Sequence, residues 1–154
     1  MEFEKLVEGF AAKVNEPGLR PDDDGAVTIE NDRVCITVQD VPELGKVMMH
    51  CALGESPAEN AAALERKMLE ANFMYRGTAG ATLSRDGETG RYYLCRCDDI
   101  VAMDVEGFCG LIESFLELSA AWRGACEGIL GAAIAEPKGD AAAEVEDLAD
   151  LIRV

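Results

Sequence analysis

The sequence predicts an α+β domain in which helices back an antiparallel sheet. Three observations support this prediction. Apolar residues recur at helical spacing in three segments, several short runs alternate apolar and polar residues, and turn-forming residues separate neighbouring runs. We therefore expect the order helix, three strands, helix, two strands, helix, followed by an acidic tail.

Composition and charge limit the function classes. The chain has 154 residues, of which 49% are hydrophobic and 29% charged, so it suits one globular domain with a real core. Its formal net charge of −16 disfavours binding to nucleic acids and to anionic membranes. The N-terminus is acidic where a secretory signal is basic, and no apolar run is long enough to span a bilayer. We therefore expect a cytoplasmic protein.

The first helix is predicted over residues 2–15. One apolar stripe at helical spacing supports it: Phe3, Leu6, Val7, Phe10 and Val14. Pro17 and Gly18 should end the helix. The loop at 19–25 contains three consecutive aspartates, but an EF-hand needs alternating ligands and a glutamate at its twelfth position. A solvated loop is therefore the favoured interpretation.

Three strands are predicted next, over residues 26–30, 33–39 and 46–53. In each, apolar side chains alternate with others, as Val27 and Ile29 do with their neighbours. Short, turn-like connections join the strands. An antiparallel meander is therefore expected.

A helix and a hairpin are predicted between residues 56 and 97. Ser56 and Pro57 fit the N-cap and first position of a helix that ends near Asn72 or Phe73. Strands are expected at 81–84 and 92–97, joined by a turn at 86–90.

A long helix should begin after Asp104 and run from 105 to about 130. Its broad apolar stripe is Phe108, Leu111, Ile112, Phe115, Leu118, Ser119, Trp122, Cys126 and Ile129. The domain is thus expected to cover 1–130. Residues 131–154 form an acidic tail, expected to be mobile or a loosely docked helix.

No catalytic or metal signature is found, and no cofactor is expected. His50 is the only histidine, so a histidine-dependent triad or an HExxH site would have to be built on it. Cys95 and Cys97 lack the second cysteine pair that is usual in structural zinc sites. The six cysteines are expected to be reduced. An enzyme or metal protein that uses His50, Cys95 and Cys97 is the remaining alternative of this class.

Residues 56–97 resemble one known family. A helix ending in LEANFM, the loop GTAGATL, the hairpin SRDGETGRYYLCR and a following long helix resemble the type III secretion chaperones of the Tir chaperone (CesT-like) family. The resemblance covers the chain to about Leu130. It implies a non-catalytic homodimer that holds the N-terminal segment of a secreted effector in a secretion-competent state.

The resemblance also implies functional residues. For client contact they are Leu6, Phe10, Val27, Ile36 and Met48. For the dimer interface they are Leu64, Met68, Phe73 and Leu83. The tail is hypothesised to occupy the client groove in the free protein. The alternative function is a cytoplasmic regulatory or sensory protein-binding domain with the same fold.

Overall fold

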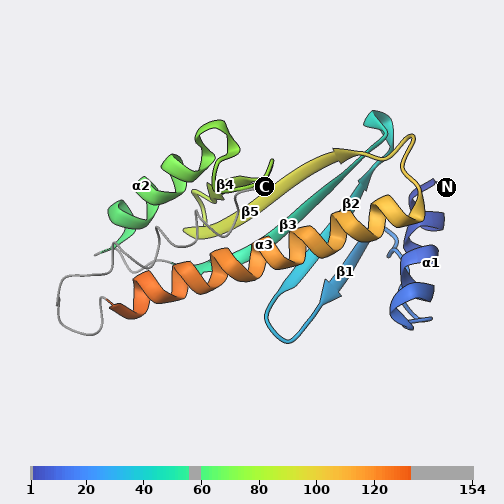
Figure 1. The fold of residues 1–154 in the computed structure, drawn as a ribbon, viewed down its shortest axis with the longest axis horizontal. Helices are drawn as coiled ribbons and strands as arrows, with labels where there is room; N and C mark the ends of the chain where they lie inside the picture. Colours follow the sequence, from blue (N-terminus) through green and yellow to red (C-terminus); the bar gives the residue numbers. More distant parts are fainter. Residues whose placement is uncertain (1, 56–59, 133–154) are drawn as a thin grey trace. The chain divides into compact units, whose positions relative to one another are not determined.

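The computed structural model describes residues 2–55 and 60–132 (Figure 1). The helices are α1 (Glu2–Val14), α2 (Ala61–Asn72) and α3 (Val105–Ala132), with the short 3₁₀ helices η1 (Pro42–Leu44) and η2 (Phe73–Tyr75). The strands are β1 (Ala26–Glu30), β2 (Cys35–Val41), β3 (Lys46–Glu55), β4 (Thr82–Arg85) and β5 (Arg91–Asp99). Their hydrogen-bonded order is β1-β2-β3-β5-β4. The predicted α+β class and element order are confirmed.

The chain divides into two compact units that share β3, β5 and α3. Of the described residues, the first unit comprises 2–51 and 96–117, and the second comprises 52–55, 60–95 and 118–132. Each unit has its own buried apolar side chains. The two units are described separately below.

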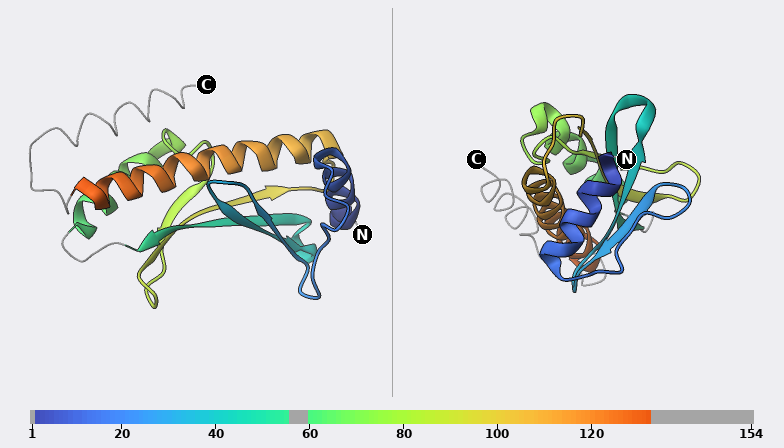
Figure 2. Two further views of the ribbon diagram at one scale, coloured as in Figure 1. Left: turned by 90° about the horizontal axis from the view of Figure 1, so that it is seen from below. Right: turned by 90° about the vertical axis from the view of Figure 1, so that its right-hand side faces the viewer.

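The core of the first unit joins α1 to the start of α3 (Figure 2). The rings of Phe3 and Phe10 both pack edge-on against Phe108, with ring centroids 6.2 and 6.3 Å apart. The aromatic quadrupoles favour this edge-to-face geometry, which stabilises the core in addition to the burial of apolar area by the rings. Gly9 allows close approach, because a Cβ there would lie 2.5 Å from a methyl of Val105.

The β1–β2 hairpin supplies the sheet side of this core. Val27 pairs with Val38 and Ile29 with Ile36, and all four side chains are buried. β2 begins at Cys35 rather than at residue 33 as predicted. The reason is the turn, in which Asn31 Oδ1 accepts hydrogen bonds from the N–H groups of residues 33 and 34 at 2.9 Å.

The second unit packs α2 and the β4–β5 hairpin with the end of α3. Leu64, Met68, Leu83 and Leu94 are buried in its core. The buried indole of Trp122 donates a hydrogen bond from Nε1 to the carbonyl of Gly77 at 2.9 Å. This bond fixes the loop after η2 to α3.

The start of α2 differs from the prediction, whereas the start of α3 agrees with it. Asn60 is not helical (φ −119°, ψ 0°), so α2 begins at Ala61, later than predicted. The predicted cap at Ser56 and Pro57 lies outside the described residues. Asp104 caps α3 as predicted, because its Oδ1 accepts the N–H of Gly107 at 2.8 Å.

The predicted apolar stripe of α3 is buried from Phe108 to Cys126. The helix extends to Ala132. Gly131 and Ala132, predicted to begin the tail, thus belong to α3, and the predictions for residues 133–154 lie outside the described residues.

Candidate functional site

A groove of about 540 Å³ lies in the first unit, between α1 and β1. We call it the α1–β1 groove. Its lining residues are Phe10, Val14, Glu16, Gly18, Leu19, Thr28, Ile29, Glu30 and Leu116. Its volume falls within the roughly 300–1,000 Å³ typical of ligand pockets.

The apolar stripe of α1 continues past the packed core to form one wall of this groove. Phe10 is buried against Phe108, whereas Val14, one turn later, is 44% exposed. Helix α1 ends at Val14, and Asn15 adopts a left-handed conformation (φ 57°). The following loop then returns Leu19 to the groove, so that apolar side chains surround an open space.

The other wall is β1, which is an edge strand. The carbonyl of Gly25 accepts a hydrogen bond from Asp40 N–H at 3.0 Å, and Asn31 N–H donates to Val34 at 2.9 Å. Antiparallel ladder bonds alternate along a strand, so Val27 and Ile29 bond to β2. The N–H and C=O groups of Thr28 and Glu30 therefore point away from β2, to the outer edge.

One end of this edge is closed by the chain itself. Asp22 N–H donates to the carbonyl of Ala26 at 2.8 Å, and Asp22 Oδ1 accepts from Ala26 N–H at 2.9 Å. No such partner is found for the outward groups of Thr28 and Glu30 within residues 2–55 and 60–132. An extended peptide could add a strand there.

The edge strand of the second unit, β4, is arranged differently. Its ladder includes the bond from Asp86 N–H to the carbonyl of Arg91 at 2.8 Å, so Leu83 and Arg85 face outward. The side chain of Asn72 binds Leu83 twice: it accepts from the N–H and donates to the C=O, both at 2.9 Å. This edge is closed at Leu83.

An exposed apolar patch lies at the end of α2 and in η2. It consists of Leu69, Phe73, Met74 and Tyr75, which are 57–73% exposed. We call it the η2 patch. Met74 and Tyr75 have φ values of 57° and 54°, which residues other than glycine adopt at a cost in conformational energy. Arg76 lies over the ring of Phe73, 5.3 Å from its centroid.

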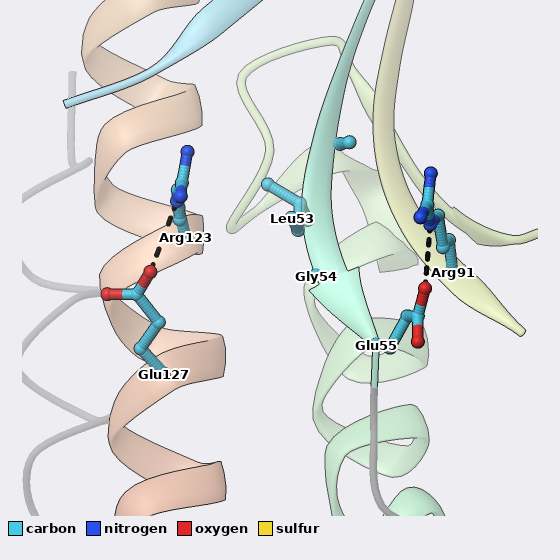
Figure 3. A pocket seen from close by; sticks show the side chains of 7 residues that line it. Leu53, Gly54, Glu55, Arg91, Arg123 and Glu127 are labelled. Atoms are coloured by element: carbon cyan, nitrogen blue, oxygen red, sulfur yellow. Dashed lines mark hydrogen bonds and ion pairs between the residues drawn. The ribbon is translucent and has the colours of Figure 1, made fainter.

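A second pocket, of about 370 Å³, lies in the second unit, and we call it the ion-paired pocket (Figure 3). Two ion pairs line it. Arg91 Nε lies 2.8 Å from Glu55 Oε1, and Arg123 Nε lies 3.1 Å from Glu127 Oε1. The charges of this pocket therefore neutralise one another.

A metal site and a reactive thiol each place requirements on the described residues. Within 2–55 and 60–132, no three of the side chains of His, Cys, Asp and Glu are placed to hold a metal ion. Burial raises the pKa of the Cys126 thiol to about 11 and also raises the pKa of Cys109. These thiols stay protonated near neutral pH and are poor nucleophiles.

The residues implied for client contact fall in different surroundings. Phe10 lines the α1–β1 groove. Leu6, Val27 and Ile36 are buried in the core of the first unit. Met48 is 46% exposed and alternates with buried neighbours on β3, so it points to the opposite face of the sheet.

The residues implied for the dimer interface divide in a similar way. Leu64, Met68 and Leu83 are buried within the second unit, whereas Phe73 is 62% exposed and belongs to the η2 patch. These assignments, like those for the client, stay predictions.

Sequence reasoning missed several residues of the groove and the η2 patch. Val14 was assigned only to the packed stripe of α1, and Leu19 to a solvated loop. Leu69 lies within the predicted helix but off its predicted apolar face, and Met74 and Tyr75 follow the predicted helix end. The sequence did contain one signal: the apolar run Phe73-Met74-Tyr75 lies at and beyond the predicted end of the helix, where the helix offers it no buried face.

Comparison with protein families gives the decisive observation. Residues 5–123 match the model of the Tir chaperone protein (CesT) family. The chain belongs to this family. No curated protein matches the sequence. None of the described helices has both the length and the apolar character needed to cross a membrane.

Solved structures show the same fold at low identity. The HopA1–SchA chaperone–effector complex is 17% identical, with a TM-score of 0.62 over 80% of this chain and 94% of that chain. The ExsC–ExsE complex is 17% identical, with a TM-score of 0.66 over 80% and 92%. YbjN, a putative transcription regulator from E. coli, is 12% identical, with a TM-score of 0.56 over 84% and 90%. The fold alone therefore does not distinguish chaperones from regulators.

Proposed function

We propose that this CesT family member is a type III secretion chaperone. It binds an extended segment of a secreted effector in the α1–β1 groove. It acts in the cytoplasm as a homodimer, without catalysis. The observation that supports the proposal most is the family match over residues 5–123, in a chain that leaves an apolar groove beside an open sheet edge.

The groove and the edge offer two kinds of contact. An apolar side chain of the client that is buried against Phe10, Val14 and Leu19 contributes about 1.5–3 kcal/mol. The outward N–H and C=O groups of Thr28 and Glu30 provide four backbone hydrogen-bonding groups, each worth a net ~0.5–1.5 kcal/mol. Backbone bonds give affinity for an extended chain of almost any sequence, which suits a client held unfolded.

Two of the solved structures are described as chaperone–effector or protein–protein complexes: HopA1 with SchA, and ExsC with ExsE. By analogy, this chain would bind a protein client. The described residues present no cluster for metal chemistry, and a binding role requires none. The likeness to YbjN keeps the regulatory alternative in view, and the experiment below separates the two.

The homodimer is proposed to form through the η2 patch. Its four apolar side chains lie within seven residues of the sequence and are 57–73% exposed, and clustered exposed apolar side chains often mark interaction sites. A two-fold interface brings a surface against its own copy, so an apolar patch is self-complementary. Glu70 and Arg76 flank the patch and can pair across such an axis. Phe73 is the one residue of the earlier dimer prediction that is exposed here.

The test is co-expression with the N-terminal segments of the secreted effectors of the same organism. We expect one of them to co-purify with the wild-type chain and to be lost with Val14→Asp, which places a charge in the groove. A Val101→Asp variant is the control, because Val101 is also exposed but lies outside the groove. Equal capture by both variants, or capture of a transcription factor alone, would contradict the proposal.

The dimer is tested separately by light scattering on a size-exclusion column. The wild-type chain should run at twice 16.5 kDa, and Phe73→Glu should be a monomer with unchanged circular dichroism. If the wild-type chain is a monomer at micromolar concentration, the proposed homodimer is wrong, and the proposal for client binding is still tested by co-expression.

A further inference from the structure

Two carboxylates lie at the rim of the α1–β1 groove. Glu16 comes from the loop after α1, and Glu30 from the end of β1. Both side chains are exposed. The ion pairs found among residues 2–55 and 60–132 include neither of them. The groove thus combines an apolar centre with negative charge that the described part of the chain leaves uncompensated.

The ion-paired pocket of the second unit shows that other acidic residues of this chain do have a cationic partner. There Glu55 is paired with Arg91 and Glu127 with Arg123 (Figure 3). The chain has about twice as many acidic as basic residues, 30 against 14. Even so, both carboxylates of that pocket have an arginine partner, whereas neither Glu16 nor Glu30 has one within the described part of the chain.

The negative surface continues beyond the groove. A neighbouring hollow of about 380 Å³ shares Leu19 with it and contains Glu4 and Glu8 of α1. Among the described residues that line this hollow, Arg20 is the one with a basic side chain. A peptide that leaves the groove past Leu19 would therefore meet two further carboxylates against one guanidinium.

We infer that the client segment carries lysine or arginine next to the apolar side chain that fills the α1–β1 groove. This inference rests on the proposed function. Opposite charges at the rim favour a basic segment, and an acidic segment is repelled by the same carboxylates. Apolar walls beside the carboxylates lower the local dielectric and strengthen this discrimination. The occupant is therefore a basic, apolar-alternating segment rather than an apolar segment of any charge.

The test uses three synthetic fluorescein-labelled peptides with one apolar-alternating centre. They differ only in the two residues that flank it, which are lysine, glutamine or glutamate. Fluorescence anisotropy with the full-length chain should give the tightest binding for the lysine peptide and the weakest for the glutamate peptide. Each exposed ion pair changes a binding constant by up to about fivefold, so we expect the lysine and glutamine peptides to differ by roughly tenfold at low salt. The difference should shrink as salt is added.

Matched variants locate the effect. Glu16→Gln/Glu30→Gln should bring the lysine peptide to the affinity of the glutamine peptide. The control, Glu55→Gln/Glu127→Gln, removes the same number of charges from the ion-paired pocket and should leave the preference for the lysine peptide unchanged. If the control reduces the preference equally, net charge rather than the groove selects the client, and the inference is overturned.

Failure of the inference and failure of the proposed function give different results. If all three peptides bind equally and Val14→Asp abolishes binding of each, the groove is the client site and the inference about charge is wrong. If binding is absent, or is insensitive to Val14→Asp, the groove is not the client site, and the proposed function and the inference both fail.

Discussion

β1 and β4 are both edge strands, but the chain treats their outward backbone groups differently. At β4, the amide side chain of Asn72 binds the N–H and the C=O of Leu83. At β1, Asp22 binds the groups of Ala26, while those of Thr28 and Glu30 have no partner in the described residues. Unprotected edges invite pairing with other chains, so proteins usually cover them. The difference indicates that the β1 edge is left open for a partner strand.

The neighbourhood of each edge agrees with this interpretation. The open part of β1 borders the α1–β1 groove, where apolar and acidic side chains face solvent. The closed part of β4 belongs to the unit that contains the η2 patch. The outward groups of Thr28 and Glu30 thus lie beside an apolar groove, whereas those of Leu83 are already bound by Asn72.

The largest effect is expected from Thr28→Pro. Proline removes the outward N–H of Thr28 and places a ring at the edge, but it breaks no ladder bond because that N–H does not face β2. We expect client affinity to fall at least about thirtyfold, which equals ~2 kcal/mol or about two net hydrogen bonds. Titration with the labelled client segment measures it.

The control for this variant is Thr28→Ala, which keeps the N–H and should bind within about twofold of wild type. Thermal unfolding of both variants verifies the fold. Wild-type affinity in a folded Thr28→Pro protein would show that clients do not pair with β1.

The second largest effect is expected from Asn72→Ala, which opens the β4 edge. Both groups of Leu83 lose their 2.9 Å partner, and partly buried groups left unpaired cost about 1–3 kcal/mol. Urea unfolding should therefore show a lower midpoint. Asn60→Ala is the matched control, since Asn60 precedes the same helix and makes no side-chain cap bond.

Client affinity should be unchanged in Asn72→Ala, because this residue closes the edge that is not used. A loss of client binding equal to that of Thr28→Pro would mean that the two edges are not functionally distinct.

The smallest effect is expected from Asp22→Ala. This change removes the bonds of Asp22 Oδ1 to the N–H groups of Asp24 and Ala26, at 3.0 and 2.9 Å. It frees the outward N–H of Ala26 at an exposed site, while the backbone bond from the N–H of residue 22 to the carbonyl of Ala26 remains. We expect a stability loss of about 0.5–1.5 kcal/mol and client binding equal to or tighter than that of wild type. Weaker binding would show that Asp22 helps to hold the client instead of limiting the edge.

The sequence predicted the elements but not the state of the edges. Periodicity located the three α-helices and five strands found in residues 2–55 and 60–132, because burial of side chains such as Phe108 or Ile36 imposes a regular pattern. The closure of β4 depends on Asn72 meeting Leu83 eleven residues later. Asparagine at a predicted helix end is equally consistent with a simple cap, so only the packing of α2 against the hairpin reveals its partner.

The site was predictable only in part, for a related reason. Phe10 and Val14 belong to one stripe in the sequence, yet Phe10 is buried and Val14 is exposed in the groove. Periodicity identifies a face of a helix, and it does not say where along that face the packing partner ends. Leu19 reaches the groove because α1 ends at Val14 and the chain turns back, which no local pattern encodes.

The most direct measurement is backbone amide hydrogen exchange of the free and the client-loaded protein. If the client adds a strand to β1, the outward amides of Thr28 and Glu30 gain hydrogen bonds, and their exchange should slow at least about tenfold. The amide of Leu83, which Asn72 already binds, should be slow in both states and serves as the internal reference. Unchanged exchange at Thr28 and Glu30 in a saturated complex would contradict the account.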